Sequence, residues 1–484
     1  MSATKEFDFK SSYIKRLKKR GRTIALHARA RLNDSNTNTF LNSASNYFDE
    51  QGEKANSNII DQFKPSKNIS NNTTAGLTFT EPLSKSFNLS GGYNYESDVS
   101  DNKQLSFNKS ASSIYDIPDT IFSNNLKTET MTSRYNLNVV YKKEKININI
   151  QGTYAKSDFK QIDMLADSTL GRRFNNWTAA SYLYFKLSKA ASINVSYNAL
   201  TTQPYSFQLL PAPQNYDPFN IRLGNPLLRP SLTNNFYVKY YLYQPTLDRG
   251  INLNSSFSNT YNAIMENRST DSAGVNTYKW SNLKGQQPSN WGLYSEVYCH
   301  IPKIDFIASI RLSANGSSSF NFINGKQNRM SLTTYSPSFS IWKNKVTYRA
   351  SFDIGPNYKI NTSSLQPFNN NSFGFSSGVS LYTKLPYNFF IGTDANYNYT
   401  GKSQVFDKSF DRTLVTAYFG KSFLKEEGLK ITVTGNDLLN QNTGYSRSGS
   451  AGMFQESRNI TIRRYFMFSL LWDFSKFGKS LKAP

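Results

Sequence analysis

Cys299 and His300 are the residues that most readily suggest catalysis, because a thiolate beside an imidazole can act as a nucleophile and its base. They are the only cysteine and one of the two histidines, the other being His27. Neighbouring side chains in a β-strand point to opposite faces, so in an extended segment these two would not meet. With two histidines no histidine-containing triad is plausible, and no GxGxxG, P-loop, HExxH or CxxC pattern occurs. We therefore expect that the chain is not an enzyme.

A second polar cluster lies in the stretch NDLLNQN, residues 436–442. The side-chain oxygens of Asp437, Asn440 and Asn442 are of the kind that bind calcium. The stretch lacks the glycine and the bidentate glutamate of a calcium-binding loop. Side chains of these types also satisfy backbone groups in turns. We therefore predict a structural role for this stretch, with no metal and no cofactor.

The decapeptide KININIQGTY, residues 145–154, shows which elements must position such residues. Its isoleucines alternate with polar residues, which predicts a β-strand with one apolar face and one polar face. The same period of two occurs at 135–141, 234–243 and 304–315. It places Ile148, Val238 and Ile310 on apolar faces, and Lys239 and Arg311 on polar faces. No helical pattern supplies a layer to cover so many apolar faces, so we predict that lipid covers them.

The composition is polar and yet rich in aromatic residues. Hydrophobic residues make up 38% of the 484 residues, the mean hydropathy is −0.56, and aromatic residues account for 15%. A disordered chain would be poor in aromatic residues. Strands that are apolar on one face only, with aromatic rings at the two membrane interfaces, explain both values. The composition therefore favours a membrane β-barrel.

The net charge of +23 raises the question of nucleic-acid binding. The basic residues are spread along the whole chain and occur in turns such as 142–145, and the one dense run is KRLKKRGR at 15–22. A cationic rim that faces anionic lipid phosphates accounts for this distribution. We therefore predict membrane lipid, and no nucleic acid, as the partner of these charges.

Two kinds of connection alternate along the chain. Short turns with charged residues, Pro or Gly occur at 18–21, 81–86, 142–145, 244–250, 301–303, 343–345, 384–386 and 425–428. Long polar stretches lie between them, at about 34–68, 99–128, 159–175, 204–230, 266–288, 318–328, 360–370, 401–410 and 438–458. Short turns on one side and long loops on the other are typical of outer-membrane barrels. Counting both flanks of every short turn, a further pair around 188–192 and the last segment at 459–474 predicts about 18–20 strands.

Two motifs go beyond this pattern. GNPLLRP closely resembles the GNPxLKPE signature that opens a strand in TonB-dependent outer-membrane receptors, with Arg229 in place of the Lys and Ser231 in place of the Glu. DLLNQN, followed by a final strand that begins RYFM, resembles the end of the outer-membrane β-barrel family related to those receptors. The motif residues, to which we assign structural roles, are Gly224, Asn225, Pro226, Arg229, Pro230, Asp437, Leu438, Leu439, Asn440, Gln441, Asn442, Arg464 and Tyr465.

The resemblance implies a transmembrane, antiparallel, up-and-down β-barrel with short periplasmic turns and long extracellular loops. It assigns residues 1–474 to a partial, C-terminal portion of a larger barrel and residues 475–484 to a basic tail. Relatives of this kind have about 22 strands and a plug. We expect that N-terminal strands and the plug are missing here. Trp472 and Phe474 are expected in the periplasmic aromatic girdle, although the basic tail departs from receptors that stop at the aromatic residue.

The resemblance implies an integral protein of the outer membrane that takes part in uptake or binding of a ligand. Its expected partners are outer-membrane lipid and lipopolysaccharide, TonB through the missing plug, and a surface lipoprotein. Two alternatives stay open. One is a structural, assembly or surface-interaction protein of the outer membrane without active transport. The other is a soluble secreted β-protein that binds nucleic acid or glycan, which would be found in the aqueous fraction without detergent.

Overall fold

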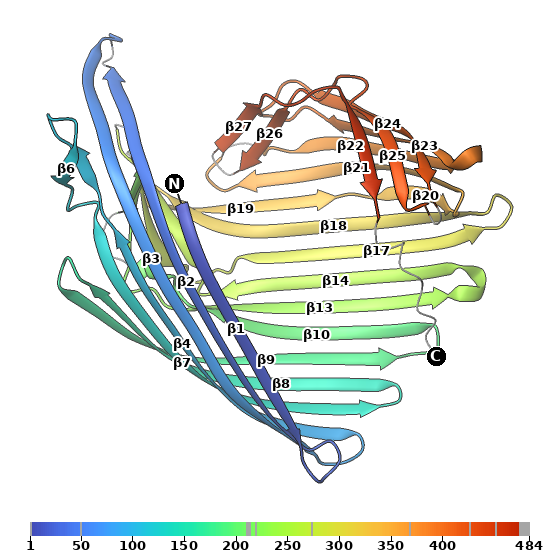
Figure 1. The fold of residues 1–484 in the computed structure, drawn as a ribbon, viewed down its shortest axis with the longest axis horizontal. Helices are drawn as coiled ribbons and strands as arrows, with labels where there is room; N and C mark the ends of the chain where they lie inside the picture. Colours follow the sequence, from blue (N-terminus) through green and yellow to red (C-terminus); the bar gives the residue numbers. More distant parts are fainter. Residues whose placement is uncertain are drawn as a thin grey trace.

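The polypeptide forms one strongly curved sheet whose long strands are all antiparallel (Figure 1); only the short pairings β12–β16 and β15–β18 of the described residues are parallel. The computed structural model describes residues 2–48, 51–209, 214–217, 220–272, 274–366, 369–424, 427–450 and 453–473. Within them the sheet has 26 strands, and β26 and β27 form a separate two-stranded sheet. Phe474 and the tail at 475–484 lie outside the described residues. No described helix is long and apolar enough to cross a membrane.

Most strands run from one end of the sheet to the other. They are β1 (Ser2–Arg16), β2 (Thr23–Phe48), β3 (Lys54–Pro82), β4 (Phe87–Gln104), β7 (Asn124–Lys143), β8 (Ile146–Asp163), β9 (Ser168–Lys186), β10 (Ala191–Thr202), β13 (Ser231–Gln244), β14 (Arg249–Tyr261), β17 (Ser289–Ile301), β18 (Phe306–Ile323), β19 (Lys326–Tyr335), β20 (Ser338–Asn344), β21 (Tyr348–Ser363), β22 (Ser372–Lys384), β23 (Phe389–Thr400), β24 (Phe410–Phe423), β25 (Leu429–Asn436) and β28 (Tyr465–Trp472).

The shorter elements lie in the connections. They are β5 (Phe107–Lys109), β6 (Tyr115–Pro118), β11 (Gln214–Asp217), β12 (Asn220–Leu223), β15 (Ile264–Thr270), β16 (Asn276–Asn282), β26 (Tyr445–Ser450), β27 (Met453–Arg458), the helix α1 (Ser206–Leu209), and the 3₁₀ turns η1 (Pro245–Leu247) and η2 (Pro386–Asn388).

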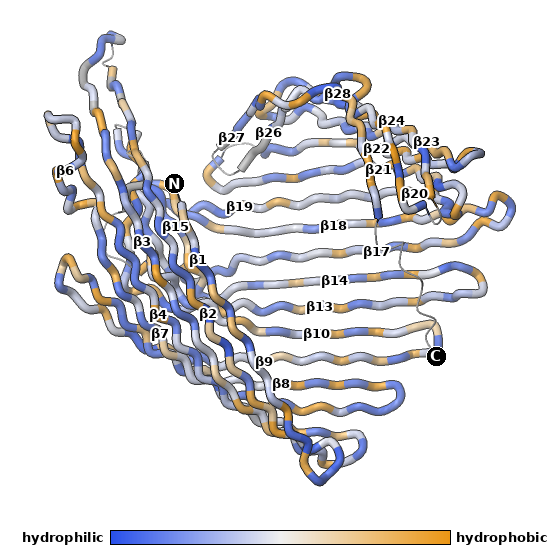
Figure 2. Tube along the Cα trace, viewed as in Figure 1, coloured by the Kyte–Doolittle hydropathy of each residue, from blue (hydrophilic) through white to orange (hydrophobic). Residues whose placement is uncertain are grey.

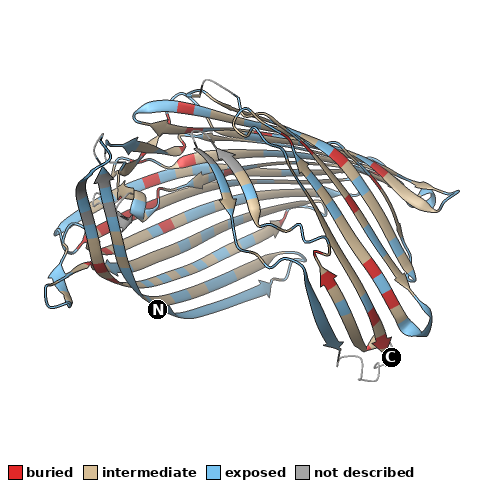
Figure 3. Cartoon of the chain, turned by 90° about the horizontal axis from the view of Figure 1, so that it is seen from above, coloured by how far each residue is buried: buried red, intermediate tan, exposed pale blue. Residues whose placement is uncertain are grey.

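The number of crossing strands agrees with the sequence prediction. β19 and β20 both pair with β18 and with β21, so they are two halves of one strand interrupted at Ser336 and Pro337, where proline cannot donate to the ladder. Counted in this way, the long strands of the described residues number nineteen, each paired with its neighbour in chain order. No pairing among them joins β1 to β28, and the curved sheet is open between these two edges (Figure 3). That further strands complete the barrel stays a prediction.

Hydrophilic and hydrophobic residues alternate along many of the strands (Figure 2), and the pairing of the strands assigns them to two different faces. Val238 and Ile310 lie on the outer face, with 44% and 59% of their surface exposed. Lys239 lies on the other face between Asn194 and Asn254 of the neighbouring strands, and Arg311 lies there beside Glu296. We call this second face the inner face, because α1, residues 220–230 and β15–β16 pack against it.

The apolar outer face is continuous from strand to strand. Val238 lies opposite Val195, Ile310 opposite Val297, and Val433 opposite Phe468. In the last strand, Phe466, Phe468, Leu470 and Trp472 share this face, as the sequence predicted. The exposed fractions of Phe466 and Phe468 are 70% and 67% in the isolated chain. Such an exposed belt of large apolar side chains requires an apolar surrounding.

The long polar stretches contain more strand than the sequence predicted. Residues 34–48 and 54–68 continue β2 and β3 in register far beyond the roughly 9–11 residues that cross a bilayer. Both faces of a strand are polar above a membrane, so the alternation that reveals a strand inside the membrane is lost there. These stretches therefore look like loops in the sequence although they form an extended hairpin.

The short turns are tied to one another by carboxylates. Glu81 next to the β3–β4 turn contacts Lys19 of the preceding turn with Nζ–Oε1 at 2.6 Å. Asp305 in the β17–β18 turn contacts Lys343 and Lys345 of the next turn at 3.2 and 3.1 Å. A hydrogen bond from His300, followed by those from the two lysines, holds the pKa of Asp305 well below its usual range. Each of these carboxylates thus links two adjacent hairpins.

Glu427 links two short turns in the same way, and its ion pairs make the unfolding free energy of the protein depend on pH. Its contacts with Lys384 and Lys430 lower the pKa of its carboxyl from 4.5 to about 2. Because the folded-state pKa is lowered, the stabilisation is present above pH 4.5 and is lost as the pH falls toward about 2. About a third of the side chain is exposed, so we expect Glu427→Gln to cost about 1 kcal/mol or less at pH 7.

Urea unfolding at pH 7 and pH 3 tests this expectation. The difference in unfolding free energy between wild type and E427Q should shrink at the lower pH. A difference that is equal at both pH values would contradict the assignment. Glu144, which lies in another short turn and has no ion pair among those of the described chain, is the matched control as E144Q.

Candidate binding site on the inner face

The segment GNPLLRP is anchored on the inner face by buried apolar side chains. Leu228 and Leu209 of α1 are both 0% exposed, and they pack with Trp280 of β16 against Phe159 and Phe174 of the wall strands β8 and β9. Leu227, its neighbour in sequence, is 78% exposed. The burial of Leu228 therefore fixes which side of the segment faces the wall.

The backbone of this segment is held by side chains from distant parts of the chain. The guanidinium of Arg172 on β9 donates to the carbonyl oxygens of Pro226 and Leu228, the latter at 3.2 Å. Asn282 accepts from the backbone N–H of Arg229 at 2.8 Å and donates to its carbonyl at 2.9 Å. Asn262 donates to the carbonyl of Pro230 at 2.8 Å. These three anchoring residues lie 32 to 56 positions away from their partners.

Within the motif, Asn225 connects the segment to its neighbours. Its side-chain amide donates to the carbonyl of Trp280 at 2.7 Å, and its side-chain oxygen accepts from the N–H of Leu227 at 3.0 Å. Its own N–H donates to the carbonyl of Gln208 at 2.6 Å. Asn225 thus joins α1, the motif and β16 in one unit, which we call the inner loop unit (α1, residues 220–230 and β15–β16).

A cavity of about 690 Å³ lies between the inner loop unit and the wall. The wall side presents rows of amide and hydroxyl side chains, in which Ser100 lies between Ser70 and Thr128, and Asn102 lies between Asn68 and Leu126. The loop side presents Phe207, Trp280, Arg222 and Glu266. Most of the side chains on the wall side of the cavity are therefore neutral and able to form hydrogen bonds.

A cluster of three aromatic rings lies beside this cavity. The rings of Tyr205 and Phe207 are stacked at 5.6 Å between centroids, and Phe207 meets Trp280 edge-on at 5.5 Å. Tyr205 and Phe207 keep 60% and 42% of their surface exposed, whereas Trp280 keeps 7%. Trp280 is thus part of the apolar anchor, and the two exposed rings are the ones that a bound molecule could contact.

A second cavity, of about 770 Å³, continues the first along β1–β4 and shares Ser70, Ser100 and Thr128 with it. Its wall carries charged pairs: Arg31 with Glu6 at 2.6 Å, and Arg29 with Asp8 at 2.9 Å. Asp98 accepts a hydrogen bond from Asn72 in the same row. The inner face therefore changes from neutral to charged toward the β1 edge.

Comparison with known proteins assigns the sequence to a family. The sequence profile of the "Outer membrane protein beta-barrel family" matches residues 15–472. The chain belongs to this outer membrane β-barrel family. It is therefore an integral protein of the outer membrane, its short turns are periplasmic, its long connections are extracellular, and its outer face contacts membrane lipid. A search of curated protein sequences gave no match.

Solved structures similar to this outer membrane barrel protein include two transporters and a receptor. "Copper transporter OprC" aligns with a TM-score of 0.44 and 10% identity over 98% of this chain and 80% of that chain. The FrpB iron transporter from Neisseria meningitidis gives 0.43 and 10% over 97% and 72%. The pyoverdine receptor FpvA from Pseudomonas aeruginosa PAO1 gives 0.47 and 14% over 94% and 61%. The chain thus spans less than two thirds of the FpvA chain.

The second motif of the barrel protein, DLLNQN, forms a turn at the extracellular end of β25. Both carboxylate oxygens of Asp437 accept backbone hydrogen bonds, from the N–H groups of Gln441 and Asn442, each at 2.9 Å. Asp437 and Asn440 have φ angles of 49° and 57°, in the left-handed region that Asn and Asp tolerate. Gln441 accepts from the N–H of Thr413 at 2.7 Å, and Arg464 donates to the carbonyl of Leu438 at 3.5 Å. The turn therefore connects β24, β25 and the segment before β28.

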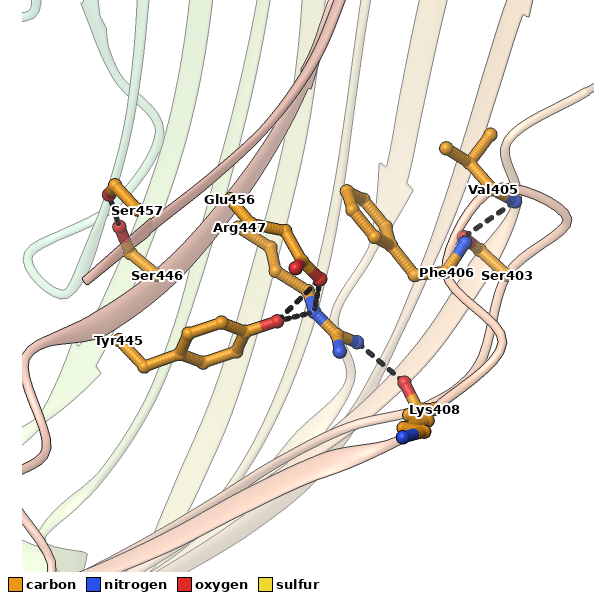
Figure 4. A network of polar contacts seen from close by, with 9 residues as sticks. All are labelled: Ser403, Val405, Phe406, Lys408, Tyr445, Ser446, Arg447, Glu456 and Ser457. Atoms are coloured by element: carbon orange, nitrogen blue, oxygen red, sulfur yellow. Dashed lines mark hydrogen bonds and ion pairs between the residues drawn. The ribbon is translucent and has the colours of Figure 1, made fainter.

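The hairpin β26–β27 is attached to the neighbouring extracellular loop by Arg447 (Figure 4). Its guanidinium donates to the carbonyl of Lys408 at 2.5 Å and to Glu456 at 3.0 Å, and lies 4.9 Å from the ring of Phe406. The hydroxyl of Tyr445 donates to Glu456 at 2.6 Å. This bond, together with the nearby arginine, lowers the pKa of the Glu456 carboxyl. Arg447 thus fastens the hairpin to the loop at 401–409.

The remaining predicted residues lie elsewhere. Cys299 shares the outer face with Val297, and His300 lies on the inner face, where its Nε2 is 2.9 Å from Asp305. Tyr465 and Trp472 are in β28, with Trp472 at the periplasmic end and 49% exposed. The roles of Arg172, Asn262 and Asn282 were not predicted from the sequence. Each residue lies in a polar stretch or a strand without a motif, so no local signal was present.

Proposed function

We propose that this protein is the barrel of an uptake receptor that binds a neutral, hydroxyl-rich solute, such as an oligosaccharide, in the 690 Å³ cavity on its inner face. The observation that supports this proposal is the lining of the cavity. Binding sites commonly combine apolar or aromatic surface with a few placed polar groups. Here Phe207 supplies an aromatic face, and Asn68, Asn102 and Asn124 supply amides that both donate and accept hydrogen bonds.

The position of the cavity supports uptake in particular. It lies at the extracellular end of the inner face, where a solute arrives, and it is bounded by the anchored inner loop unit. The contacts of Arg172 and Asn262 are to backbone groups of the loop unit, so they hold the unit in place without using the side chains that line the cavity. Asn282, which is itself in β16, ties Arg229 to the rest of the unit. A preformed site of this kind loses little conformational entropy on binding.

Native mass spectrometry of the detergent-purified protein with a panel of neutral oligosaccharides tests the proposal. Ser100→Trp fills the wall side of the cavity and should abolish the bound species. Ser255→Trp, an equal change at an exposed position of the outer face, should leave it unchanged. If no oligosaccharide binds, or if the S100W protein binds as the wild type does, the proposal is wrong. Retention of peptides instead would assign a different substrate class.

A further inference from the structure

The outer face carries a lysine at an unusual place for a charge. Lys421 of β24 lies on the lipid-facing side, between Phe389 of β23 and Ile431 of β25. It is two residues from the end of the strand at Phe423, and therefore close to the periplasmic membrane interface. Its side chain is half-buried. A lysine at this depth can extend its ammonium group toward the headgroups.

The ammonium group of Lys421 rests on aromatic rings. It lies 4.5 Å from the ring centroid of Phe389 and 5.3 Å from that of Phe423. Phe389 is in turn stacked on Phe419 at 5.4 Å. No ion pair joins Lys421 to an acidic side chain within the described part of the chain, where the nearby carboxylate of Glu427 is engaged with Lys384 and Lys430. Cation–π contacts with the two rings fix the position of the ammonium group. Among the described residues, no carboxylate neutralises its charge.

An apolar groove lies on the same face of the sheet. Phe419, on which Phe389 is stacked, is one of its lining residues, and Lys421 is the next outward-facing residue along β24. Thr393, Ala417 and Gly435 lie side by side on β23, β24 and β25 and form its floor. The larger side chains of Ile391, Phe419 and Phe466 form its walls, and its volume is about 850 Å³. Ala417 and Lys421 lie on the same face of β24, four residues or roughly 13 Å apart. The groove therefore runs from the interface toward the middle of the membrane.

We propose that this groove binds an anionic phospholipid, with the phosphate at Lys421 and one acyl chain over Ala417 and Gly435. The groove lies within the lipid-facing belt, so its occupant comes from the membrane. The positive charge selects an anionic headgroup, because basic residues at a membrane surface attract anionic lipids. The row of small residues between large ones gives the acyl chain a fixed position, which a uniform apolar surface does not.

The test uses native mass spectrometry of the full chain, delipidated in detergent and then mixed with phosphatidylglycerol or with phosphatidylcholine of the same acyl chains. The wild type should retain phosphatidylglycerol preferentially. Lys421→Gln should lower this retention about fivefold and leave phosphatidylcholine unaffected. Ala417→Leu, which fills the groove, should lower the retention of both lipids.

Lys143→Gln is the matched control, because Lys143 also faces outward at a periplasmic strand end but is on β7, whereas the groove lies over β21–β25 and β28. It should bind phosphatidylglycerol as the wild type does. Lys421→Arg keeps the charge and should retain binding, which separates loss of charge from loss of folding. The proposal is overturned if K421Q binds phosphatidylglycerol as tightly as the wild type, or if K143Q loses as much. Unchanged binding by A417L would also overturn it.

Discussion

Ile150→Arg destabilises this protein by about 2–4 kcal/mol, whereas Gln151→Arg has little effect. Ile150 is on the outer face, 53% exposed in the isolated chain, and lies opposite Val139 and Ser181. It is four residues from the periplasmic end of β8, roughly 13 Å along the strand, which at a tilt of about 40° is about 10 Å into the membrane. A guanidinium at that depth loses its hydration and has no counter-ion, while the inner face at position 151 is polar.

Urea unfolding of the protein folded into phosphatidylcholine vesicles measures this difference, with the shift of the electrophoretic mobility on heating as a check of folding. The two substitutions are adjacent in sequence and identical in size and charge, so only the face differs. Equal losses of unfolding free energy in I150R and Q151R would contradict the assignment of the two faces. So would a destabilised Q151R beside an unaffected I150R.

The architecture was largely predictable from the sequence because the membrane imposes a strict pattern on each strand. The alternation in residues 145–154, 234–243 and 304–315 placed Ile148, Val238, Lys239 and Arg311 on the correct faces. Short charged turns marked the ends of the strands. The pattern failed above the membrane, where both faces are wet and strand residues such as 34–48 have no apolar row.

The candidate site was much less predictable. The sequence drew attention to GNPLLRP, but the groups that hold this segment come from Arg172, Asn262 and Asn282, which no local pattern connects to it. Their contacts arise because the barrel brings β9 and the β14–β17 connection to the same end of the inner face. Such long-range pairing follows from the topology and not from residue spacing, so it became visible only in the structure.

The second large effect is expected at Leu228. Leu228→Ala should increase the free energy of the native inner loop unit by about 2–5 kcal/mol, because Leu228 is fully buried between Phe159, Phe174 and Trp280. The wall strands do not depend on this cluster, so global unfolding in urea should change little. The loss should appear as local opening, measured by amide hydrogen exchange of residues 224–230, with exchange at least about 30-fold faster than in the wild type.

Leu227→Ala provides the matched control, since it removes the same atoms from the adjacent, 78% exposed position. Its exchange rates should stay close to those of the wild type. If L228A and L227A exchanged alike, the segment would not be anchored through Leu228, and the bonds from Arg172 would have to carry the attachment alone. If instead only L228A opens and the cavity's oligosaccharide binding is lost with it, the binding site depends on the anchor. A site whose one side is a loop is preformed only as long as that loop stays packed on the wall.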